Sequence, residues 1–270
     1  MIRDITIGQF FPGKSALHRM DPRAKLTLLV VYIVMIFVAS NFWGLGLSAL
    51  FLIGVTMLSK VPIKTLLKSI RPLLIVIVFT ALINIFYVDG NTLVQWGIFR
   101  ITDKGIYTAI FMAVRIILLV LGGSVLTYTT SPTDLTDGLE RLLSPLGKIR
   151  LPVHELAMMM SIALRFIPTL LEETDKIMAA QKARGADMES GGLMQRVKAL
   201  IPILIPLFVS AIRRAYDLAI AMECRCYRGG KGRTRMRQLH LGSVDAWGIV
   251  VTAVCLGGVI ALKVLLPATL

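Results

Sequence analysis

The stretch Ile106–Thr127, IYTAIFMAVRIILLVLGGSVLT, is uncharged and mostly apolar apart from Arg115. A helix that crosses the hydrocarbon core of a bilayer needs about 20 predominantly apolar residues, and this stretch is long enough. Val244–Leu266 is a second such stretch. Shorter apolar runs precede both, and these are Leu26–Ser40, Leu45–Leu58 and Pro72–Val88. The sequence therefore predicts an all-α integral membrane protein with about five transmembrane helices.

The composition favours the same fold class. Of the 270 residues, 56% are hydrophobic and 17% are charged, and the mean hydropathy of +0.74 is too high for an ordinary soluble domain. The formal net charge is nevertheless +14. In a membrane protein, such an excess of Lys and Arg is typical of cytoplasmic loops. Nucleic acid is not an expected partner, because the arginines are not interleaved with exposed aromatic residues.

Loop charges orient the predicted helices. Residues 1–25 form a basic N-terminal arm, and the loop between the second and third apolar runs is also basic, so both belong in the cytoplasm. We expect the first four transmembrane helices within residues 26–130, a cytoplasmic coupling domain over residues 131–243 and a last transmembrane helix over residues 244–270. The first two apolar runs form either a tight helical hairpin, which we favour, or one bent element. The expected location is the cell (plasma) membrane.

The predicted coupling domain contains one short helix and two long ones. The short helix covers residues 131–146 and begins at a Ser-Pro pair. The first long helix covers residues 152–185, which corresponds to about 50 Å, and it should bend at Pro168. The second covers residues 194–228. Both long helices mix charged and apolar side chains, so we expect them to pack on each other beneath the membrane domain with their tips free.

Both long helices end in an arginine between two small residues. The first ends in Ala183-Arg184-Gly185 and the second in Cys224-Arg225-Cys226. Small neighbours let a helix end approach the backbone of a partner closely, and a guanidinium can bind an acidic group through two parallel hydrogen bonds. One such arginine would be an ordinary cationic C-cap. Two of them, on two similar helices, predict a pair of docking sites.

Longer strings around these motifs resemble one protein family. They are GQFFPGKSALHRMDPRAK, TTSPTDLTDGLERLLSPL, QKARGAD and AMECRCYRGGKGRTRM. Over essentially the whole chain the sequence is similar to the transmembrane T subunit of energy-coupling factor (ECF) vitamin importers, of the shared, group II type. The resemblance implies a non-catalytic scaffold that joins two ABC-type ATPase subunits to a small membrane S subunit, which binds the vitamin.

The same resemblance assigns roles to the two motifs and to the cofactors. Each arginine motif would sit in a groove of one ATPase, and the scaffold would transmit ATP-driven motion to the S subunit. ATP and magnesium would be bound by the ATPases, with no cofactor or metal on this chain. Cys224 departs from the family pattern, which usually has Ala at this place, but Cys is also small.

Charged residues on the long helices suggest how the helices cross. We expect acidic side chains of the first to form ion pairs with arginines of the second, and the candidates are Glu172, Glu173, Asp175, Arg213 and Arg214.

Two further sites have expected structural roles. Asp21-Pro22-Arg23 predicts a turn and an N-cap that anchor the first span, with a partner contact as a secondary reading. Arg115 lies inside an apolar span, where a charge usually faces protein rather than lipid. We expect it to pack against Asn84 or against a partner subunit.

Two motif matches are not expected to be functional. Residues 8–15 fit the pattern G-x-x-x-x-G-K-[ST], but a P-loop follows a strand and opens a helix, and Pro22 would interrupt such a helix. Cys224 and Cys226 lie near His240, but a structural zinc site requires four ligands.

Two other function classes remain open. A conventional ABC-importer permease would carry one short coupling helix per chain and would occur as a pair. A metal-dependent membrane transferase would need an acidic metal-binding cluster. Two acidic groups are of the kind that could form one, and they are Asp134 with Asp137, and Glu172 with Glu173 and Asp175. Both groups lie near basic residues, which favours solvated or salt-bridged faces.

Overall fold

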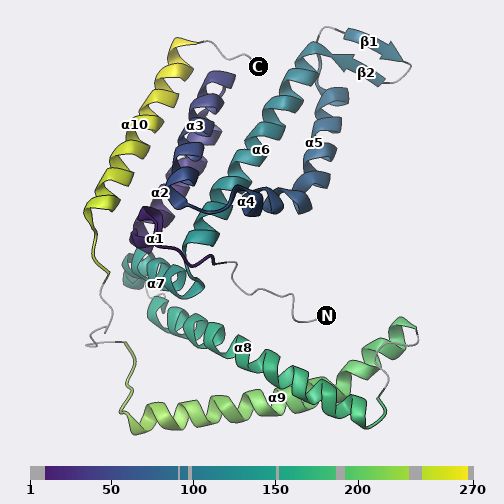
Figure 1. The fold of residues 1–270 in the computed structure, drawn as a ribbon, viewed down its shortest axis with the longest axis vertical. Coiled ribbons are helices and arrows are strands. Elements are labelled where there is room, and N and C mark those ends of the chain that lie inside the picture. The colour runs from purple at the N-terminus through teal and green to yellow at the C-terminus, as the bar shows by residue number, and fades with distance from the viewer. Residues whose placement is uncertain are drawn as a thin grey trace. The chain divides into compact units, whose positions relative to one another are not determined.

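The computed structural model describes residues 10–90, 92–96, 99–149, 152–186, 192–230 and 239–266. It consists of helices with one two-stranded hairpin, so the predicted all-α class is confirmed (Figure 1). The chain divides into two compact units. We call the described residues of Thr6–Leu142 and Arg237–Leu270 the bundle unit, and those of Leu143–Met236 the helix-pair unit.

The bundle unit contains every apolar run that the sequence assigns to a membrane span. Its elements are α1 (Ala16–Arg19), α2 (Pro22–Val38), α3 (Phe42–Ser59), α4 (Ile63–Ile70), the 3₁₀ turn η1 (Arg71–Leu73), α5 (Leu74–Tyr87), β1 (Thr92–Trp96), β2 (Phe99–Thr102), α6 (Asp103–Thr129), α7 (Pro132–Leu143) and α10 (Ser243–Leu265). The first two apolar runs form two separate helices, α2 and α3, as the favoured hairpin requires.

The helix-pair unit contains a 3₁₀ turn and the two long helices. These are η2 (Ser144–Ile149), α8 (Val153–Ala183) and α9 (Leu193–Cys224). Prolines lie inside both helices without ending them. The helix α8 lies within the predicted range 152–185, and it begins one residue later and ends two residues earlier. The helix α9 ends earlier than the predicted residue 228, because Cys226 adopts a left-handed backbone with φ of 54°.

Six helical segments of the described chain are long and apolar enough to cross a membrane. They are α3, the continuous stretch Ile63–Tyr87, α6, α8, Lys198–Cys224 of α9, and α10. The helix α2 has 17 residues, which corresponds to about 25 Å and is slightly short for a bilayer core of about 30 Å. By length and composition α8 and α9 therefore also qualify as spans, although their charges led us to predict a place outside the bilayer.

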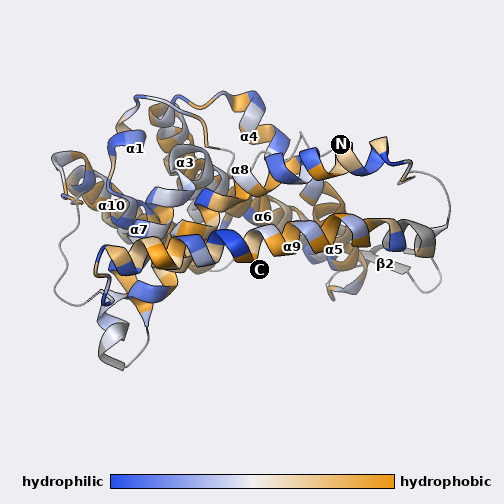
Figure 2. Ribbon diagram, turned by 90° about the horizontal axis from the view of Figure 1, so that it is seen from below, coloured by the Kyte–Doolittle hydropathy of each residue, from blue (hydrophilic) through white to orange (hydrophobic). Residues whose placement is uncertain are grey.

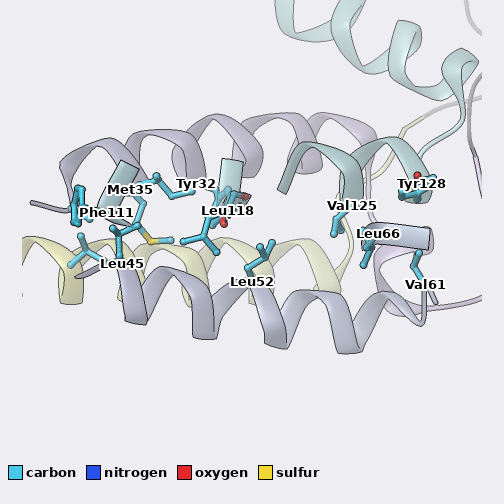
Figure 3. Packing of buried hydrophobic residues seen from close by; sticks show 13 residues of the cluster. Tyr32, Met35, Leu45, Leu52, Val61, Leu66, Phe111, Leu118, Val125 and Tyr128 are labelled. Carbon is cyan, nitrogen blue, oxygen red and sulfur yellow. Dashed lines mark hydrogen bonds between the residues drawn. The ribbon is translucent and has the colours of Figure 1, made fainter. Parts of the chain in front are cut away.

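The core of the bundle unit lies between α2, α3, α6 and α10 (Figure 3). Met35, Ile36 and Phe111 are fully buried there. Gly122 of α6 lets Tyr32 of α2 come close, since a Cβ at this glycine would lie 2.4 Å from the tyrosine ring. The helices α2 and α6 are thus fixed in register.

The short helix α7 packs with the bundle unit rather than with the two long helices. Gly138 of α7 lies against Pro22, and a Cβ at this glycine would come within 2.9 Å of the proline Cβ. Thr136 is also buried. This contact at the start of α2 explains why α7 belongs to the bundle unit, whose boundary with the helix-pair unit lies near Leu142.

Two buried carboxylates fix the starts of α2 and α10. Asp21 is the predicted N-cap of α2, and its Oδ1 accepts a hydrogen bond from the Arg23 backbone N–H at 2.9 Å. Asp245 accepts from the Gly242 backbone N–H at 2.7 Å and from the Asp21 backbone N–H at 2.9 Å. The Arg23 guanidinium donates to the Leu239 carbonyl. One set of contacts therefore joins two segments that are far apart in the sequence.

Arg115 does not contact Asn84, so this one of its two predicted contacts was wrong, and a contact with a partner subunit stays a prediction. Its Nη2 donates to the Ala39 carbonyl at the end of α2 at 2.7 Å, and its guanidinium lies 4.7 Å from the centre of the Phe111 ring. Asn84 donates to Thr80 of its own helix. The carbonyl of Asn84 lies close to Gly105, which precedes Arg115 by ten residues, or about 15 Å of helix.

We did not predict the hairpin between α5 and α6. The strands β1 and β2 pair antiparallel, with an irregularity between Thr92 and Val94. The Thr102 hydroxyl donates to the Val88 carbonyl at 2.7 Å and accepts from the Gly105 N–H at 3.0 Å. It thereby caps α6 and ties the end of the hairpin to the end of α5.

Candidate functional site

The first arginine motif forms a regular helix end. Arg184 caps α8, and Gly185 follows it with φ of 85°. The Gly185 N–H donates to the Lys182 carbonyl at 3.0 Å, and the Ala186 N–H donates to the Gln181 carbonyl at 3.0 Å. This pair of bonds is a Schellman motif, which ends a helix sharply and leaves the capping side chain at its tip.

The second motif has the same backbone bonds. The Cys226 N–H donates to the Glu223 carbonyl at 2.8 Å, and the Tyr227 N–H donates to the Met222 carbonyl at 3.0 Å. Arg225 occupies the capping position, as Arg184 does at the end of α8, and Cys226 occupies the left-handed position. The two arginines are therefore presented by equivalent turns.

All residues of both motifs are exposed in the structure, and they are Ala183, Arg184, Gly185, Cys224, Arg225 and Cys226. The thiols of Cys224 and Cys226 are free. An exposed guanidinium between small residues can enter a narrow acidic groove, because no bulky neighbour blocks its approach.

An ion pair joins the two long helices between their ends. Glu173 of α8 accepts from Arg214 of α9, with 2.9 Å between Oε2 and Nη2 and 3.2 Å between Oε2 and Nε. The Ser210 hydroxyl donates to the other carboxylate oxygen of Glu173. The hydrogen bond from Ser210 first, and then those from Arg214, lower the pKa of the Glu173 carboxyl below its ordinary value.

The other charged residues expected at the crossing take no part in it. Glu172, Asp175 and Arg213 are exposed and form no ion pair with another part of the described chain. Sequence spacing placed all five residues near the crossing. It could not tell which side of each helix faces the other.

The two helices run antiparallel, so their tips lie at opposite ends of the helix-pair unit (Figure 1). Gln181 near the end of α8 donates to the Pro202 carbonyl in the first half of α9. At the other end, Gly230 beyond α9 packs against His154 at the start of α8. Arg184 lies eleven residues beyond Glu173, and Arg225 lies eleven residues beyond Arg214. Each tip is therefore about 16 Å of helix from the ion pair, and the two tips lie in opposite directions from it.

Polar and apolar residues alternate along both helices (Figure 2). Exposed charged residues occur along α8 and α9, and they include Arg165, Glu172, Asp175, Arg213 and Asp217. Lipid-facing helices rarely carry so many charges, whereas a helix beside the membrane can hold them in water and keep its apolar side for a partner.

The described residues hold no group of three or more His, Cys, Asp or Glu side chains that could bind a metal ion. The expectation that metals and nucleotides belong to other subunits therefore stays a prediction.

Comparison with known proteins bears on the whole chain. Residues 13–236 match the family CbiQ, described as cobalt transport protein. A protein of Ruminiclostridium cellulolyticum called energy-coupling factor transporter transmembrane protein EcfT is 52% identical, over 97% of this chain and 98% of its own length. Proteins of the same name from Thermosediminibacter oceani and Bacillus subtilis are 51% and 48% identical, each over 93% of this chain and 95% of its own length.

Proposed function

The chain belongs to the CbiQ family, as an energy-coupling factor transporter transmembrane protein, and from this premise we propose that it couples two ATPase subunits to a substrate-binding S subunit. The ATPases would bind and hydrolyse ATP with magnesium. This chain would contribute no catalytic residue and would hold no cofactor. Its bundle unit would lie in the plasma membrane, with the N-terminal arm and the helix-pair unit in the cytoplasm.

One observation carries the proposal: two equivalent arginine turns at opposite ends of one antiparallel helix pair. A pair of similar ATPases requires two similar docking sites that are far enough apart for two proteins. Arg184 and Arg225 meet both conditions, because each caps an exposed helix end and the two ends point away from a shared crossing.

The antiparallel pair also suggests how motion would be transmitted. When two bound ATPases close on ATP, each would displace one helix tip. The contact of Glu173 with Arg214 and Ser210 would convert the two displacements into a change of the crossing. The altered helix pair would then tilt or release the S subunit, which would open its vitamin site to the cytoplasm.

Co-purification of the tagged chain with its ATPases tests the docking sites. We expect Arg184→Ala and Arg225→Ala each to weaken ATPase retention in mild detergent, and the double variant to abolish both retention and transport. The matched control is Arg165→Ala with Arg213→Ala, which removes two exposed arginines from the same helices away from their tips. Equal retention by the two double variants would refute docking through the tips.

The native thiols give an independent readout of docking at α9. In a Cys255→Ser background, Cys224 and Cys226 are the remaining cysteines and both are exposed. A maleimide should label them in the isolated chain, and bound ATPase should protect them. Labelling that is unchanged in the assembled complex would place the ATPase elsewhere on the chain.

A further inference from the structure

A cavity of about 240 Å³ lies inside the bundle unit between α1, α2, α3, α6 and α10. At one end of the bundle α3 and α10 touch, where a Cβ at Gly258 would lie 3.0 Å from the Leu47 side chain. Val55 of α3 and Val251 of α10 both line the cavity, and so do Ala16 and Leu17 of α1. The cavity therefore occupies space between α3 and α10 away from the Gly258–Leu47 contact.

The cavity wall offers almost nothing to a polar ligand. Most of its side chains are apolar. Of the polar ones, Tyr32 donates to the Leu118 carbonyl, Thr129 to Val125, Thr252 to Gly248, and Lys25 to the Thr129 carbonyl and the Thr130 hydroxyl, which leaves the indole N–H of the exposed Trp247. A smaller apolar cavity, of about 150 Å³ in another protein, stays free of water and takes up benzene. An apolar occupant is therefore favoured here over water.

The cavity opens toward the outer surface of α3 and α10. Leu58, Trp247 and Val251 line it and are at the same time exposed by 60%, 70% and 46%. In a membrane-spanning bundle this surface faces lipid. A tryptophan at the end of a span is typical of the interface between hydrocarbon and headgroups, so the opening lies near headgroup level.

Two exposed cations neighbour residues that line the cavity. Arg19 lies in α1 beside the lining residues Leu17 and Met20, and Lys60 follows Leu58 by two residues. Both cations are exposed. Exposed Lys and Arg at headgroup level attract anionic lipids, each by about 1 kcal/mol.

We propose that the cavity binds one acyl chain of an anionic phospholipid, with the phosphate held by Arg19 and Lys60. The apolar cavity accounts for the acyl chain, and the two cations next to its lining residues account for the headgroup. A bound chain would fill the space between α3 and α10 and hold the two helices in their present separation. The proposal depends on the bundle unit lying in a membrane, and it does not depend on ATPase docking.

Photo-crosslinking in vesicles tests the acyl-chain site. The full chain is reconstituted in phosphatidylcholine with a minor share of phosphatidylglycerol that carries a diazirine at the end of one acyl chain. We expect the label to concentrate on peptides that line the cavity. Val251→Trp should fill the opening and cause loss of this label, and Val254→Trp is the matched control, since Val254 is 68% exposed on the same helix and does not line the cavity.

Val55→Phe narrows the cavity from the side of α3 and serves as a second variant if Val251→Trp does not fold. Label spread evenly over the exposed apolar faces, or unchanged in these variants, would overturn the proposal. Label that is lost when the chain is assembled with its partner proteins would show that a protein side chain occupies the cavity, which also overturns it.

The headgroup site has its own test. The double variant Arg19→Gln with Lys60→Gln should lose the preference for the phosphatidylglycerol probe over a matching phosphatidylcholine probe. The control variant, Lys64→Gln with Lys68→Gln, removes the same amount of charge from exposed positions of α4. It should keep the preference for the phosphatidylglycerol probe. Equal loss in both variants would mean that general surface charge, and not this site, attracts the lipid.

Discussion

Cys226 holds at the end of α9 the left-handed position that Gly185 holds at the end of α8. Both residues donate to the carbonyl three positions before them, and both follow the capping arginine. A residue with a Cβ pays about 1–2 kcal/mol in this conformation, whereas glycine does not. The second turn is therefore formed with strain that the first turn lacks.

Cys226→Gly should stabilise the α9 turn. Relief of the strain outweighs the extra freedom of glycine in the unfolded chain, which is about 0.5–1 kcal/mol, so a net gain of up to about 1 kcal/mol is expected. Amide hydrogen exchange measures this locally, and the amides of Cys226 and Tyr227 should exchange up to about fivefold more slowly.

Cys224→Gly is the control for this change. Cys224 is the last helical residue of α9, where glycine is less favourable than other residues by about 0.5–1 kcal/mol. The same chemical change two positions earlier should therefore speed exchange. Similar effects of both substitutions would show that the sulfur atoms, and not the backbone conformation, determine the stability of the turn.

Arg214→Ala should loosen the helix pair, and Arg213→Ala should not. Arg214 binds Glu173 across the crossing, whereas its neighbour Arg213 is exposed and unpaired in the described chain. Thermal unfolding in mild detergent, followed by circular dichroism, should give a lower midpoint for Arg214→Ala than for Arg213→Ala. Equal midpoints would mean that the ion pair contributes nothing measurable.

The same contact predicts a pH dependence. The hydrogen bonds to Glu173 lower its carboxyl pKa in the folded chain, so their contribution is complete above the ordinary value of 4.5 and is lost as the pH falls through the lower folded value. The midpoint difference between the wild type and Glu173→Gln should therefore be constant near neutral pH and shrink in acid. If the midpoint difference persisted in acid, its cause would be side-chain packing and not the ionised carboxylate.

The sequence predicted the helices and the two arginine tips because both signals are local. Apolar length identifies a span, and a small-Arg-small string after a helical pattern identifies a helix end. The position of the α9 end was missed because Cys226 is not a usual C-cap residue, whereas the Gly229-Gly230 pair beyond it is. Which of these two positions ends the helix is determined by backbone hydrogen bonds, and residue preferences do not predict those bonds.

Contacts between distant segments were the least predictable. Arg115 was expected to pack against Asn84 or a partner subunit, and the packing of α5 on α6 keeps it apart from Asn84. The hairpin did leave a trace, since Thr92–Trp96 and Phe99–Thr102 are rich in β-branched and aromatic residues and enclose a two-residue gap that starts with glycine.

Arg115→Met should destabilise the bundle unit. The substitution removes the group that donates to the Ala39 carbonyl at the end of α2. Leaving this carbonyl without a donor in apolar surroundings costs about 1–3 kcal/mol. Arg115→Gln keeps a donor on a shorter side chain, so its thermal unfolding midpoint in mild detergent should lie between those of the wild type and Arg115→Met. If Arg115 served mainly a partner subunit, the midpoint of the isolated chain would not change.

Asp245→Ala should have the largest effect on the bundle unit, because one side chain serves two helix starts. Its carboxylate accepts from Gly242 at the start of α10 and from Asp21 at the start of α2, and it is 2% exposed. Two buried N–H groups would lose their acceptor at about 1–3 kcal/mol each.

Asp245→Asn keeps one acceptor oxygen and turns the other into a donor, which faces an N–H group and cannot bind it. The unfolding midpoint in mild detergent should therefore fall for Asn and fall further for Ala. If the two helix starts were instead held by apolar packing, the conservative Asn variant would unfold at the wild-type midpoint.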